Sequence, residues 1–448
     1  MSWLTDHFHE FEPEIISKFF KKQKEEIEHW PKKKILEYQT EAVKEIVQHA
    51  YKNNPFYKKK LEERKIIPSD TKGLEDIERI PFTTKDELRG KPWILLSVPR
   101  REISQVHVST GTTGGEHTYI LYTWEDLFIR DLAPAMPHLV PVEEDDVVIN
   151  ALPYEMSSAG LSFHRVFQDG TGAMVVPTGK GGAYSTPEKT IKIAKDLGTT
   201  IIITTPSYAV YLAEVAESIG IKPGEDIKPR FMWLTGEGCS FSFRDRVESI
   251  WKCPAYFYYG SLECGPLGIE CSEKEGYHIP KAHVYVEIVD KEDQHRLDFG
   301  EIGEIVVTVL LRKATPLIRF RTGDLGYIDD IPCPCGIEWE RLYLRGRKED
   351  QIYIGGKEYS PFYIEEFLMR IPEVSCWYQF IVRDEVLLIQ VEAAKDIVPS
   401  EKIGEMISSK IEYAVDVPNK VEFVANLPRP SGKLVRVIDQ RTNKEVNR

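Results

Sequence analysis

The sequence predicts an α/β protein with a large N-terminal α/β domain, an added antiparallel β region and a small C-terminal α+β domain. Three observations support this prediction. Short β-branched runs alternate with helical segments between residues 100 and 345. From 284 to 328 apolar and polar residues alternate, with turns between the runs. Residues 347–448 mix helical and strand-like segments, as a small separate domain does.

The elements follow in chain order. Residues 7–66 carry Lys, Glu and aromatic residues at helical spacing, so we expect helices there. The expected strands of the α/β part are DVVINALP, GAMVVPTG, TTIIITTP, RFMWLTGE and PAYFYYG, and its expected helices include PEKTIKIAKDLG and SYAVYLAEVAESIG. Several of these strands end directly in Gly, Ser or Thr loops. Ligands of open α/β sheets bind at such strand ends.

The C-terminal part has its own pattern. VYVEIVD, GEIGEIVVTVLL and TPLIRFRTGDLGYI predict the antiparallel region. A helix in EYSPFYIEEFLMRIPEV, a hairpin in YQFIVRDEVLLIQVEA and a helix in SEKIGEMISSKIEYAV follow. The charged, glycine-containing stretch LRGRKED suits a linker. We therefore expect one domain at residues 1–345 and a second at 346–448.

Composition excludes several classes of protein. The net charge is −13, from 58 basic and 71 acidic residues, which argues against a nucleic-acid binder that neutralises phosphates. No apolar run approaches the ~20 residues that span a bilayer, and the N-terminus lacks a secretory pattern. Seven cysteines in 448 residues are not a disulfide framework. We expect a soluble, cytoplasmic protein without nucleic-acid or membrane partners.

One stretch, VSTGTTGGEH at 108–117, concentrates glycines and hydroxyls. Glycines let several backbone N–H groups face an anion, and Ser and Thr hydroxyls add donors. The stretch lacks the lysine of the GxxxxGK[ST] pattern, which excludes a P-loop nucleotidase. It lies between two regular elements, because HTYILYTWEDL predicts a strand and then a helix.

STGTTGG resembles the phosphate-contacting loop of adenylate-forming enzymes, the group of acyl-CoA synthetases and peptide-synthetase adenylation domains. Similar motifs follow in the family's order: TGEG at 235–238, YYGSLE at 258–263, RTGDL at 321–325, GRKEDQIYIGG at 346–356 and PRPSGKLVRV at 428–437. Six ordered motifs are far more specific than any one of them. PRPSGKLVRVIDQR, GGKEYSPFYIEEFL and PYEMSSAGLSFH are similar to the phenylacetate-CoA ligase branch.

The resemblance implies a reaction in two halves. A carboxylate attacks the α-phosphate of ATP to give an acyl-adenylate, and a thiol, usually coenzyme A, then displaces AMP. Preorganised cations and N–H donors accelerate the first half because charge gathers on the phosphate oxygens. By resemblance, Lys433 is the catalytic cation on a mobile C-terminal lid. Glu263 holds magnesium, a metal that takes one or two carboxylates, and Ser261 lies near the α-phosphate.

The resemblance also assigns residues to the nucleotide and to the lid hinge. Tyr259 stacks on adenine, and Asp324 accepts both ribose hydroxyls. Arg347 and Glu349 mark the hinge, and Gly355 and Gly356 fit a tunnel for the pantetheine arm. The remaining expected nucleotide contacts are Ser109, Thr110, Gly111, Thr112, Thr113, Gly114, Gly236, Glu237, Gly238 and Gly260.

The expected acid pocket lies in PYEMSSAGLSFH, which is similar to the family's pocket helix. The residues that line it are Tyr154, Ser157, Ala159 and Gly160. The small residues Ser157, Ala159 and Gly160 leave room for a planar or bulky acid. Ser157 departs from the branch, which tends to be aromatic there. We assign His164 no acid–base role.

A second constellation suggests a metal. Cys271, His278, Cys333 and Cys335 are three thiols and one imidazole, a common tetrahedral zinc set. Some phenylacetate-CoA ligase relatives carry a similar set. The alternative ligands are Cys264 and His283. Four ligands leave no open position, so we expect a structural zinc.

We thus expect an AMP-forming carboxylic acid–CoA ligase that uses ATP, magnesium and coenzyme A on an aromatic carboxylic acid, and family relatives suggest a homodimer. The alternative is an adenylate-forming enzyme with another acceptor: one that loads an amino or hydroxy acid on a carrier protein, forms an amide, or adenylylates a cofactor as coenzyme F390 synthetases do. A non-catalytic nucleotide-binding module is disfavoured because Lys433 and Glu263 are both present.

Overall fold

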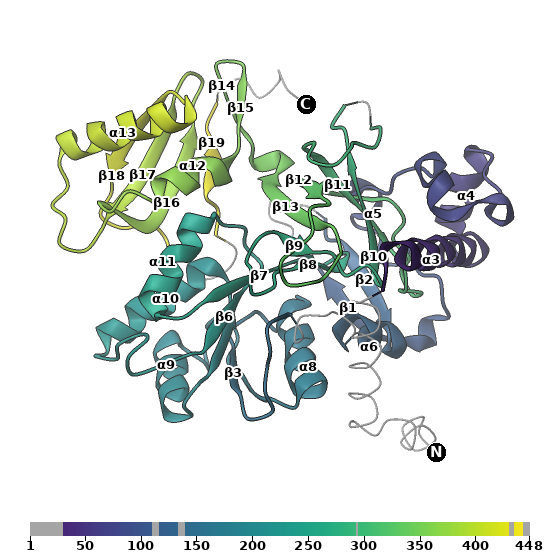
Figure 1. The fold of residues 1–448 in the computed structure, drawn as a ribbon, viewed down its shortest axis with the longest axis horizontal. Coiled ribbons are helices and arrows are strands. Elements are labelled where there is room, and N and C mark those ends of the chain that lie inside the picture. The colour runs from purple at the N-terminus through teal and green to yellow at the C-terminus, as the bar shows by residue number, and fades with distance from the viewer. Residues whose placement is uncertain (1–29, 110–115, 133–138, 293, 430–433, 442–448) are drawn as a thin grey trace. The chain divides into compact units, whose positions relative to one another are not determined.

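The computed structural model describes residues 30–109, 116–132, 139–292, 294–429 and 434–441 (Figure 1). The chain forms two compact units. The first comprises Met1–Gly179 and Tyr256–Tyr343, and the second Lys180–Ala255 and Leu344–Arg448. The second unit thus takes in a segment of the predicted N-terminal domain, and the domain boundary at 345/346 stays a prediction.

The first unit begins with helices, as the sequence predicted for residues 7–66; the part of that range before residue 30 lies outside the described residues. α3 is anchored beside the antiparallel strands because the buried Gln39 amide donates to the Val284 carbonyl at 3.2 Å. The helical elements are α3 (Lys32–Asn53), α4 (Pro55–Glu63), η1 (Pro68–Asp70), η2 (Gly73–Arg79), α5 (Lys85–Leu88), η3 (Arg100–Glu102), α6 (Trp124–Leu132) and α8 (Ala159–Thr171).

The strands of this unit are β1 (Ile103–Val108), β2 (Tyr119–Thr123), β3 (Val147–Asn150), β4 (Met174–Pro177), β7 (Ala255–Ser261), β8 (Gly265–Ile269), β9 (Tyr277–His278), β10 (Val284–Val289), β11 (Gly303–Val309), β12 (Phe320–Asp329) and β13 (Arg341–Arg347). β3 and β4 pair in parallel. β10 pairs with β11 and β11 pairs with β12, both antiparallel, which confirms the predicted antiparallel region. β7, β8, β9 and β13 form a second antiparallel run.

Strands β10 and β11 are fully buried, although alternating apolar and polar residues often mark an antiparallel sheet with one face in water. Every residue of β10 and β11 is buried, the polar ones included. Glu287 can be buried because Arg319 lies 2.9 Å from its carboxylate, and the two side chains are 0% and 3% exposed. The alternation of polar residues therefore marks a buried ion pair rather than a solvated face.

The second unit contains β5 (Ile201–Thr204) and β6 (Phe231–Leu234), a parallel pair in which every residue is buried. Helices α9 (Pro187–Asp196), α10 (Pro206–Ser218) and α11 (Phe241–Trp251) lie alongside this pair (Figure 1). α9 and α10 each begin with a proline after a threonine cap, Thr186 and Thr205, whose hydroxyls accept backbone N–H groups. β5, β6, α9 and α10 were predicted, whereas α11 was not.

The rest of this unit is the predicted α+β part. Its sheet has the order β18–β17–β16–β19, with helices α12 and α13 beside it (Figure 1). β16 and β17 form the predicted hairpin. The elements are η4 (Lys348–Asp350), β14 (Ile352–Ile354), β15 (Lys357–Tyr359), α12 (Pro361–Leu368), β16 (Val374–Val382), β17 (Leu387–Ala393), α13 (Glu401–Val415), β18 (Asn419–Phe423) and β19 (Val437–Asp439).

Candidate active site

The glycine–hydroxyl loop is described at its two ends. Thr110, Gly111, Thr112, Thr113 and Gly114 lie outside the described residues. Ser109, which precedes them, is buried and exchanges two hydrogen bonds with Thr118: Ser109 N–H donates to the Thr118 carbonyl at 3.0 Å, and Ser109 Oγ accepts from Thr118 N–H at 2.9 Å. Ser109 therefore joins the strands β1 and β2 on either side of the loop.

A tight turn between β7 and β8 presents Glu263. Ser261 Oγ accepts the N–H of Cys264 at 3.0 Å, which closes the turn around Glu263. Gly260 is required for the close pairing of the two strands, because a Cβ there would lie 2.7 Å from the Gly265 carbonyl oxygen. Ser261 thus has a structural role, and its O–H hydrogen can still be donated to a ligand.

Two cations surround Glu263, which is 6% exposed. Lys85 Nζ lies 3.2 Å from Glu263 Oε1. Arg312 Nη1 donates to the Glu263 carbonyl oxygen at 2.6 Å and so fixes the backbone. Within the described part of the chain, Oε1 makes no hydrogen bond of acceptable geometry, so the lysine contact is an ion pair that leaves acceptor capacity on this oxygen.

Two predicted nucleotide contacts meet directly. The Tyr259 hydroxyl donates to Asp324 Oδ2 at 2.6 Å, and both side chains are half-buried. Tyr259 lies in β7, and Asp324 in β12, so the pair connects the strand before Glu263 to the strand that carries RTGDL.

In the second unit, the TGEG loop follows β6. Glu237 accepts from Lys180 Nζ at 2.9 Å and from Ser207 N–H at 3.3 Å, and the Lys180 and Glu237 side chains are 6% and 8% exposed. Burial alone would raise the pKa of Glu237, but the Lys180 charge and the Ser207 hydrogen bond outweigh it, so the pKa is lowered. The carboxylate is therefore ionised and held in place at neutral pH.

Glycines flank Glu237 for different reasons. Gly236 has φ +79, a conformation that favours glycine. Gly238 faces the Phe362 ring of α12, and a Cβ at this position would overlap that ring. The TGEG loop thus packs directly on the C-terminal part of the chain within the second unit.

The hinge residues form an exposed pair. Arg347 Nη1 lies 3.4 Å from Glu349 Oε1, with side chains 39% and 69% exposed. Such a pair contributes little stability. Gly355 and Gly356 form the turn between β14 and β15 with φ +58 and +77, so a two-residue hairpin accounts for both glycines. Lys433 lies outside the described residues.

The residues of the predicted acid pocket lie at the start of α8 and in the loop before it. Tyr154 and Ser157 precede the helix, which begins at Ala159, so only part of the predicted pocket segment is helical. The Tyr154 hydroxyl and His164 Nδ1 are 3.1 Å apart. Gly160 is required here because a Cβ would lie 2.6 Å from the Pro153 carbonyl oxygen.

The four predicted metal ligands come together. The donor atoms of Cys271, His278, Cys333 and Cys335 all lie within 4.8 Å of one another. Cys271 and Cys333 Sγ are 3.6 Å apart, and Cys335 Sγ lies 3.4 Å from His278 Nε2. Donors bound tetrahedrally to one zinc at about 2.3 Å lie about 3.8 Å apart, so the cluster fits that metal.

The pKa shifts of the cluster's side chains also fit a metal site. Burial, and to a lesser extent Arg341, lowers the pKa of His278 to about 4, so the imidazole is in the neutral form that binds metals. Burial raises the pKa of Cys271 and of Cys335, which leaves these thiols protonated unless a cation stabilises the thiolates.

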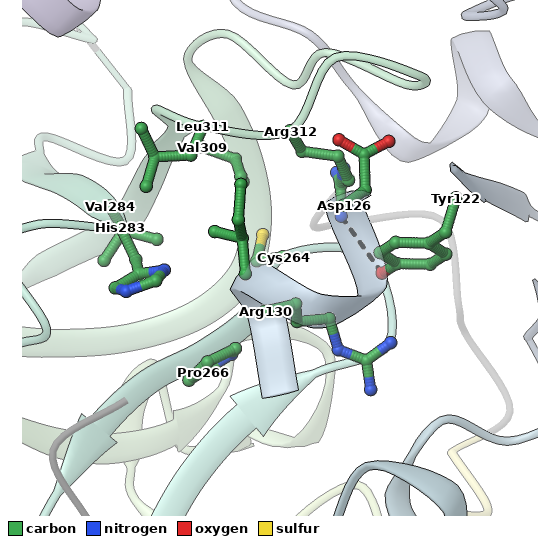
Figure 2. Close-up of a pocket in the computed structure, with 11 residues that line it drawn as sticks. Tyr122, Asp126, Arg130, Cys264, Pro266, His283, Val284, Val309, Leu311 and Arg312 are labelled. Carbon is green, nitrogen blue, oxygen red and sulfur yellow. Dashed lines mark hydrogen bonds between the residues drawn. The ribbon is translucent and has the colours of Figure 1, made fainter. Parts of the chain in front are cut away.

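The alternative ligands lie elsewhere. Cys264 and His283 line a cavity of about 20 Å³ together with Tyr122, Arg130 and Arg312 (Figure 2). Arg312 Nη1 donates to the Tyr122 hydroxyl at 3.1 Å along one wall. Neither residue belongs to the four-ligand cluster, so the first-choice ligand set is the one that the fold assembles.

Residues 97–309 match the AMP-binding enzyme family, and residues 356–441 match the AMP-binding enzyme C-terminal domain. A phenylacetate-coenzyme A ligase of Thermus thermophilus is 33% identical over 93% of this chain and 99% of its own length. The chain belongs to the phenylacetate-CoA ligase branch of the adenylate-forming enzymes. This confirms the family and the fold class that the sequence motifs indicated.

Solved structures of a related adenylate-forming enzyme, 2-hydroxyisobutyryl-CoA ligase, add a conformational comparison. Its postadenylation state, in complex with 2-HIB-AMP, matches with a TM-score of 0.82 at 25% identity, covering 89% of this chain and 88% of the other. Its thioesterification state matches with a TM-score of only 0.65 at 25% identity, covering 92% and 91%. Both states therefore share the fold of this chain.

Sequence reasoning missed two lysines of this adenylate-forming enzyme. Lys85 faces Glu263, and Lys180 faces Glu237. A local signal existed for the first, because Thr84 and Glu87 form a capping box that starts α5 at Lys85. For Lys180 the signal is only its place between glycines in TGKGG.

Proposed function

We propose that this AMP-forming acid–CoA ligase activates an aromatic or aryl-alkyl carboxylic acid and transfers its acyl group to coenzyme A. The observation that carries the proposal is the contact between Phe163 and Tyr258. Their rings pack edge to face, and the ring centroids lie 4.7 Å apart. Phe163 follows the pocket segment in α8, and Tyr258 precedes Tyr259 in β7. An aromatic wall therefore joins the expected acid pocket to the expected nucleotide strand.

Different residues bind the nucleoside, the phosphates and the metal. Asp324 and Tyr259 hold the ribose and adenine, and Lys433 neutralises the substrate carboxylate and the α-phosphate. Glu263 fits magnesium, because its buried Oε1 keeps acceptor capacity and a single carboxylate with phosphate oxygens suits this ion. Magnesium supplies charge neutralisation on the phosphates when bound. The Ser261 hydroxyl donates to a nearby phosphate oxygen.

The test is pyrophosphate exchange across a panel of acids, followed by thioester formation with coenzyme A. The panel contains phenylacetate, benzoate, 2-hydroxyisobutyrate and acetate. We expect the aromatic acids to give the highest kcat/KM, and thioester to form only with coenzyme A present. Strongest exchange with acetate or 2-hydroxyisobutyrate contradicts the aromatic assignment. Exchange without any thioester product favours another acceptor.

We also propose that Cys271, His278, Cys333 and Cys335 bind a structural zinc, as their convergence supports. Protein purified without added zinc is expected to contain about one zinc per chain. Cys333→Ser is expected to lose the metal, whereas Cys264→Ser, a buried cysteine outside the cluster, keeps it. Less than half an equivalent in the unaltered protein contradicts the site.

A further inference from the structure

The contact between Lys85 and Glu263 joins an accessible cation to a buried anion. Lys85 Nζ lies 3.2 Å from Glu263 Oε1, and the side chains are 37% and 8% exposed. Among the described residues, Glu263 is the one acidic group within 4 Å of this ammonium. A lysine that serves only to neutralise a buried carboxylate has no need of exposure, so the open side of Lys85 is available to a ligand.

The ion pair uses only part of the hydrogen-bonding capacity of the Lys85 ammonium and of the Glu263 carboxylate. Glu263 Oε1 is buried and makes no well-directed hydrogen bond within the described chain. An ammonium has three rotatable N–H donors, of which this ion pair engages at most one. Both groups therefore keep capacity for further partners, the oxygen for a metal and the nitrogen for an anion.

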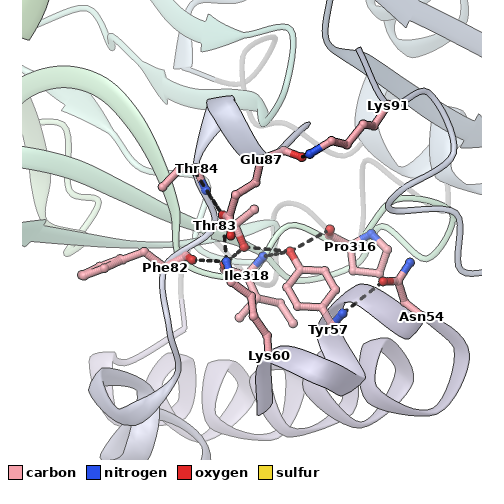
Figure 3. Close-up of polar contacts among 10 residues, drawn as sticks. All are labelled: Asn54, Tyr57, Lys60, Phe82, Thr83, Thr84, Glu87, Lys91, Pro316 and Ile318. Carbon is pink, nitrogen blue, oxygen red and sulfur yellow. Dashed lines mark hydrogen bonds and ion pairs between the residues drawn. The ribbon is translucent and has the colours of Figure 1, made fainter. Parts of the chain in front are cut away.

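The segment before Lys85 is held rigidly (Figure 3). Thr83 Oγ1 donates to the Ile318 carbonyl at 2.8 Å, and Thr83 N–H donates to the Arg319 carbonyl at 2.9 Å. The buried Tyr57 hydroxyl donates to the Pro316 carbonyl at 3.2 Å and contacts Thr83 Oγ1 at 3.1 Å. These contacts tie the segment to the residues that lead into β12, the strand that carries Asp324.

The turn that carries Lys85 is fixed by its own carboxylate. Glu87 accepts the Thr84 N–H at 2.8 Å and the Lys60 ammonium at 2.8 Å (Figure 3). α5 thus projects Lys85 from a supported backbone, as a binding residue requires. Support of this kind exceeds what a solvated surface lysine needs.

Several residues around Lys85 are acidic, so an anionic ligand can bind there only if cations such as Lys85 offset their charge. Glu263 and Asp324 are acidic, and so is Glu116, which directly follows the glycine–hydroxyl loop. The segment after Lys85 runs beside Glu116, because Gly90 N–H donates to the His117 carbonyl at 2.9 Å and a Cβ on Gly90 would meet the Glu116 carboxylate. A polyphosphate near three carboxylates requires cations to be placed among them.

We propose that Lys85 is a further phosphate-binding residue of the adenylation half-reaction. Glu263 holds the ammonium in position, and the ammonium contacts the β- or γ-phosphate of the bound nucleotide. The inference rests on the proposed function, because it assumes that ATP binds beside Glu263. It follows that Lys85 acts on ATP and pyrophosphate but has no contact with AMP or with the acyl-adenylate.

The test compares nucleotides that differ in these phosphates. Affinities of the full-length protein for magnesium ATP and for AMP are measured by titration calorimetry, and the thioester half-reaction is started from a supplied acyl-adenylate. Lys85→Met is expected to weaken ATP binding by about 10- to 100-fold. AMP affinity and the thioester rate are expected to change by less than about 2-fold. Lys85→Arg, which keeps the charge, is expected to recover part of the loss.

Lys91→Met is the matched control, since this exposed lysine lies in the same segment and its ammonium donates to the Glu87 carbonyl at 3.1 Å. It is expected to leave both affinities unchanged. Equal losses for ATP and AMP in Lys85→Met, or no loss for either, overturn the inference; Lys85→Gln must give the same split if the methionine variant folds poorly. If the unaltered protein binds neither nucleotide, the proposed function fails instead.

Discussion

Lys433 is the residue on which the first half of the reaction is expected to depend. Lys433→Ala removes the cation that we propose neutralises the substrate carboxylate and the α-phosphate, so adenylate formation is expected to fall by at least about 100-fold. The thioester half-reaction from a supplied adenylate does not need that charge and is expected to be largely intact. Pyrophosphate exchange and single-turnover thioester formation measure the two halves. Equal losses in both contradict the role.

Lys180 is the cation that pairs with the buried Glu237 of the TGEG loop. Lys180→Met leaves the Glu237 carboxylate buried with the Ser207 N–H as its one remaining described donor. Removing the nearest cation from a buried carboxylate is costly even though the charge of Arg436 still acts on it, so the free energy of unfolding is expected to fall by about 2–4 kcal/mol. Urea unfolding at pH 7 measures the change.

The control for Lys180 is Lys195, which lies in the same unit. Lys195 pairs with Asp226 at 3.3 Å, but the side chains are 44% and 35% exposed. Lys195→Met is expected to cost less than about 1 kcal/mol because water screens this pair. Similar losses in the two variants would mean that Glu237 is not held by a buried ion pair.

At the residue scale, the sequence identified side chains that stand in motifs and missed those that act from outside them. Glu263, Tyr259 and Asp324 were predicted from YYGSLE and RTGDL, and the fold brings Tyr259 and Asp324 into contact. Lys85 and Lys180 were not predicted. Most lysines are solvated, and only the tertiary fold reveals that these two face buried carboxylates.

Among the elements, Glu340 connects three segments of the first unit. Its carboxylate contacts Lys281 and lies 3.1 Å from Lys32 at the start of α3. Burial alone would raise the pKa of Glu340, but the Lys281 charge lowers it from 4.5 to about 2. A lowered pKa means that the ionised carboxylate stabilises the fold above pH 4.5, and that this stability is lost as the pH falls toward 2.

Glu340→Gln is therefore expected to flatten the acid dependence of stability. Between pH 6 and 3, the unaltered protein is expected to lose on the order of 1–3 kcal/mol more than the variant. Urea unfolding at both pH values measures this difference. Glu338→Gln, an exposed position nearby, is expected to keep the original dependence. Parallel pH profiles for all three proteins would exclude Glu340 as the source.

The elements themselves were largely predictable. β-branched runs such as TTIIITTP became buried strands, and Pro after Thr marked the starts of α9 and α10. The buried ion pair of Glu287 and Arg319 was not predictable, because a charged residue in an alternating strand usually faces water. The Gly355–Gly356 pair was assigned to a tunnel, whereas hairpin geometry alone already requires it.

At the scale of the whole molecule, a conformational change of the C-terminal part is the main expectation from the family. 2-Hydroxyisobutyryl-CoA ligase has been solved in postadenylation and thioesterification states, and this chain shares the fold of both. No helix of the described part has the length and apolar character to cross a membrane. The homodimer stays a prediction that sedimentation can test.

Contacts inside the second unit hold residues 344–448 against residues 180–255. Glu366 accepts from Ser242 N–H at 2.9 Å and Ser242 Oγ at 2.7 Å, at the start of α11. Arg246 donates from Nε to the Met369 carbonyl at 2.7 Å and from Nη2 to the Ile371 carbonyl at 2.7 Å. The predicted rotation of the C-terminal part about Arg347 would separate these groups, so we expect the contacts to form in one state of the reaction cycle.

Arg246→Ala is therefore expected to affect the two half-reactions unequally. Losing charge-assisted hydrogen bonds worth about 1.5–3 kcal/mol shifts the population away from the present arrangement by about 10- to 100-fold. Pyrophosphate exchange is expected to fall accordingly, while thioester formation from a supplied adenylate is unchanged or faster. Asp245→Ala, an exposed neighbour on α11, controls for the helix. A loss confined to the thioester half would show that these contacts stabilise the opposite state.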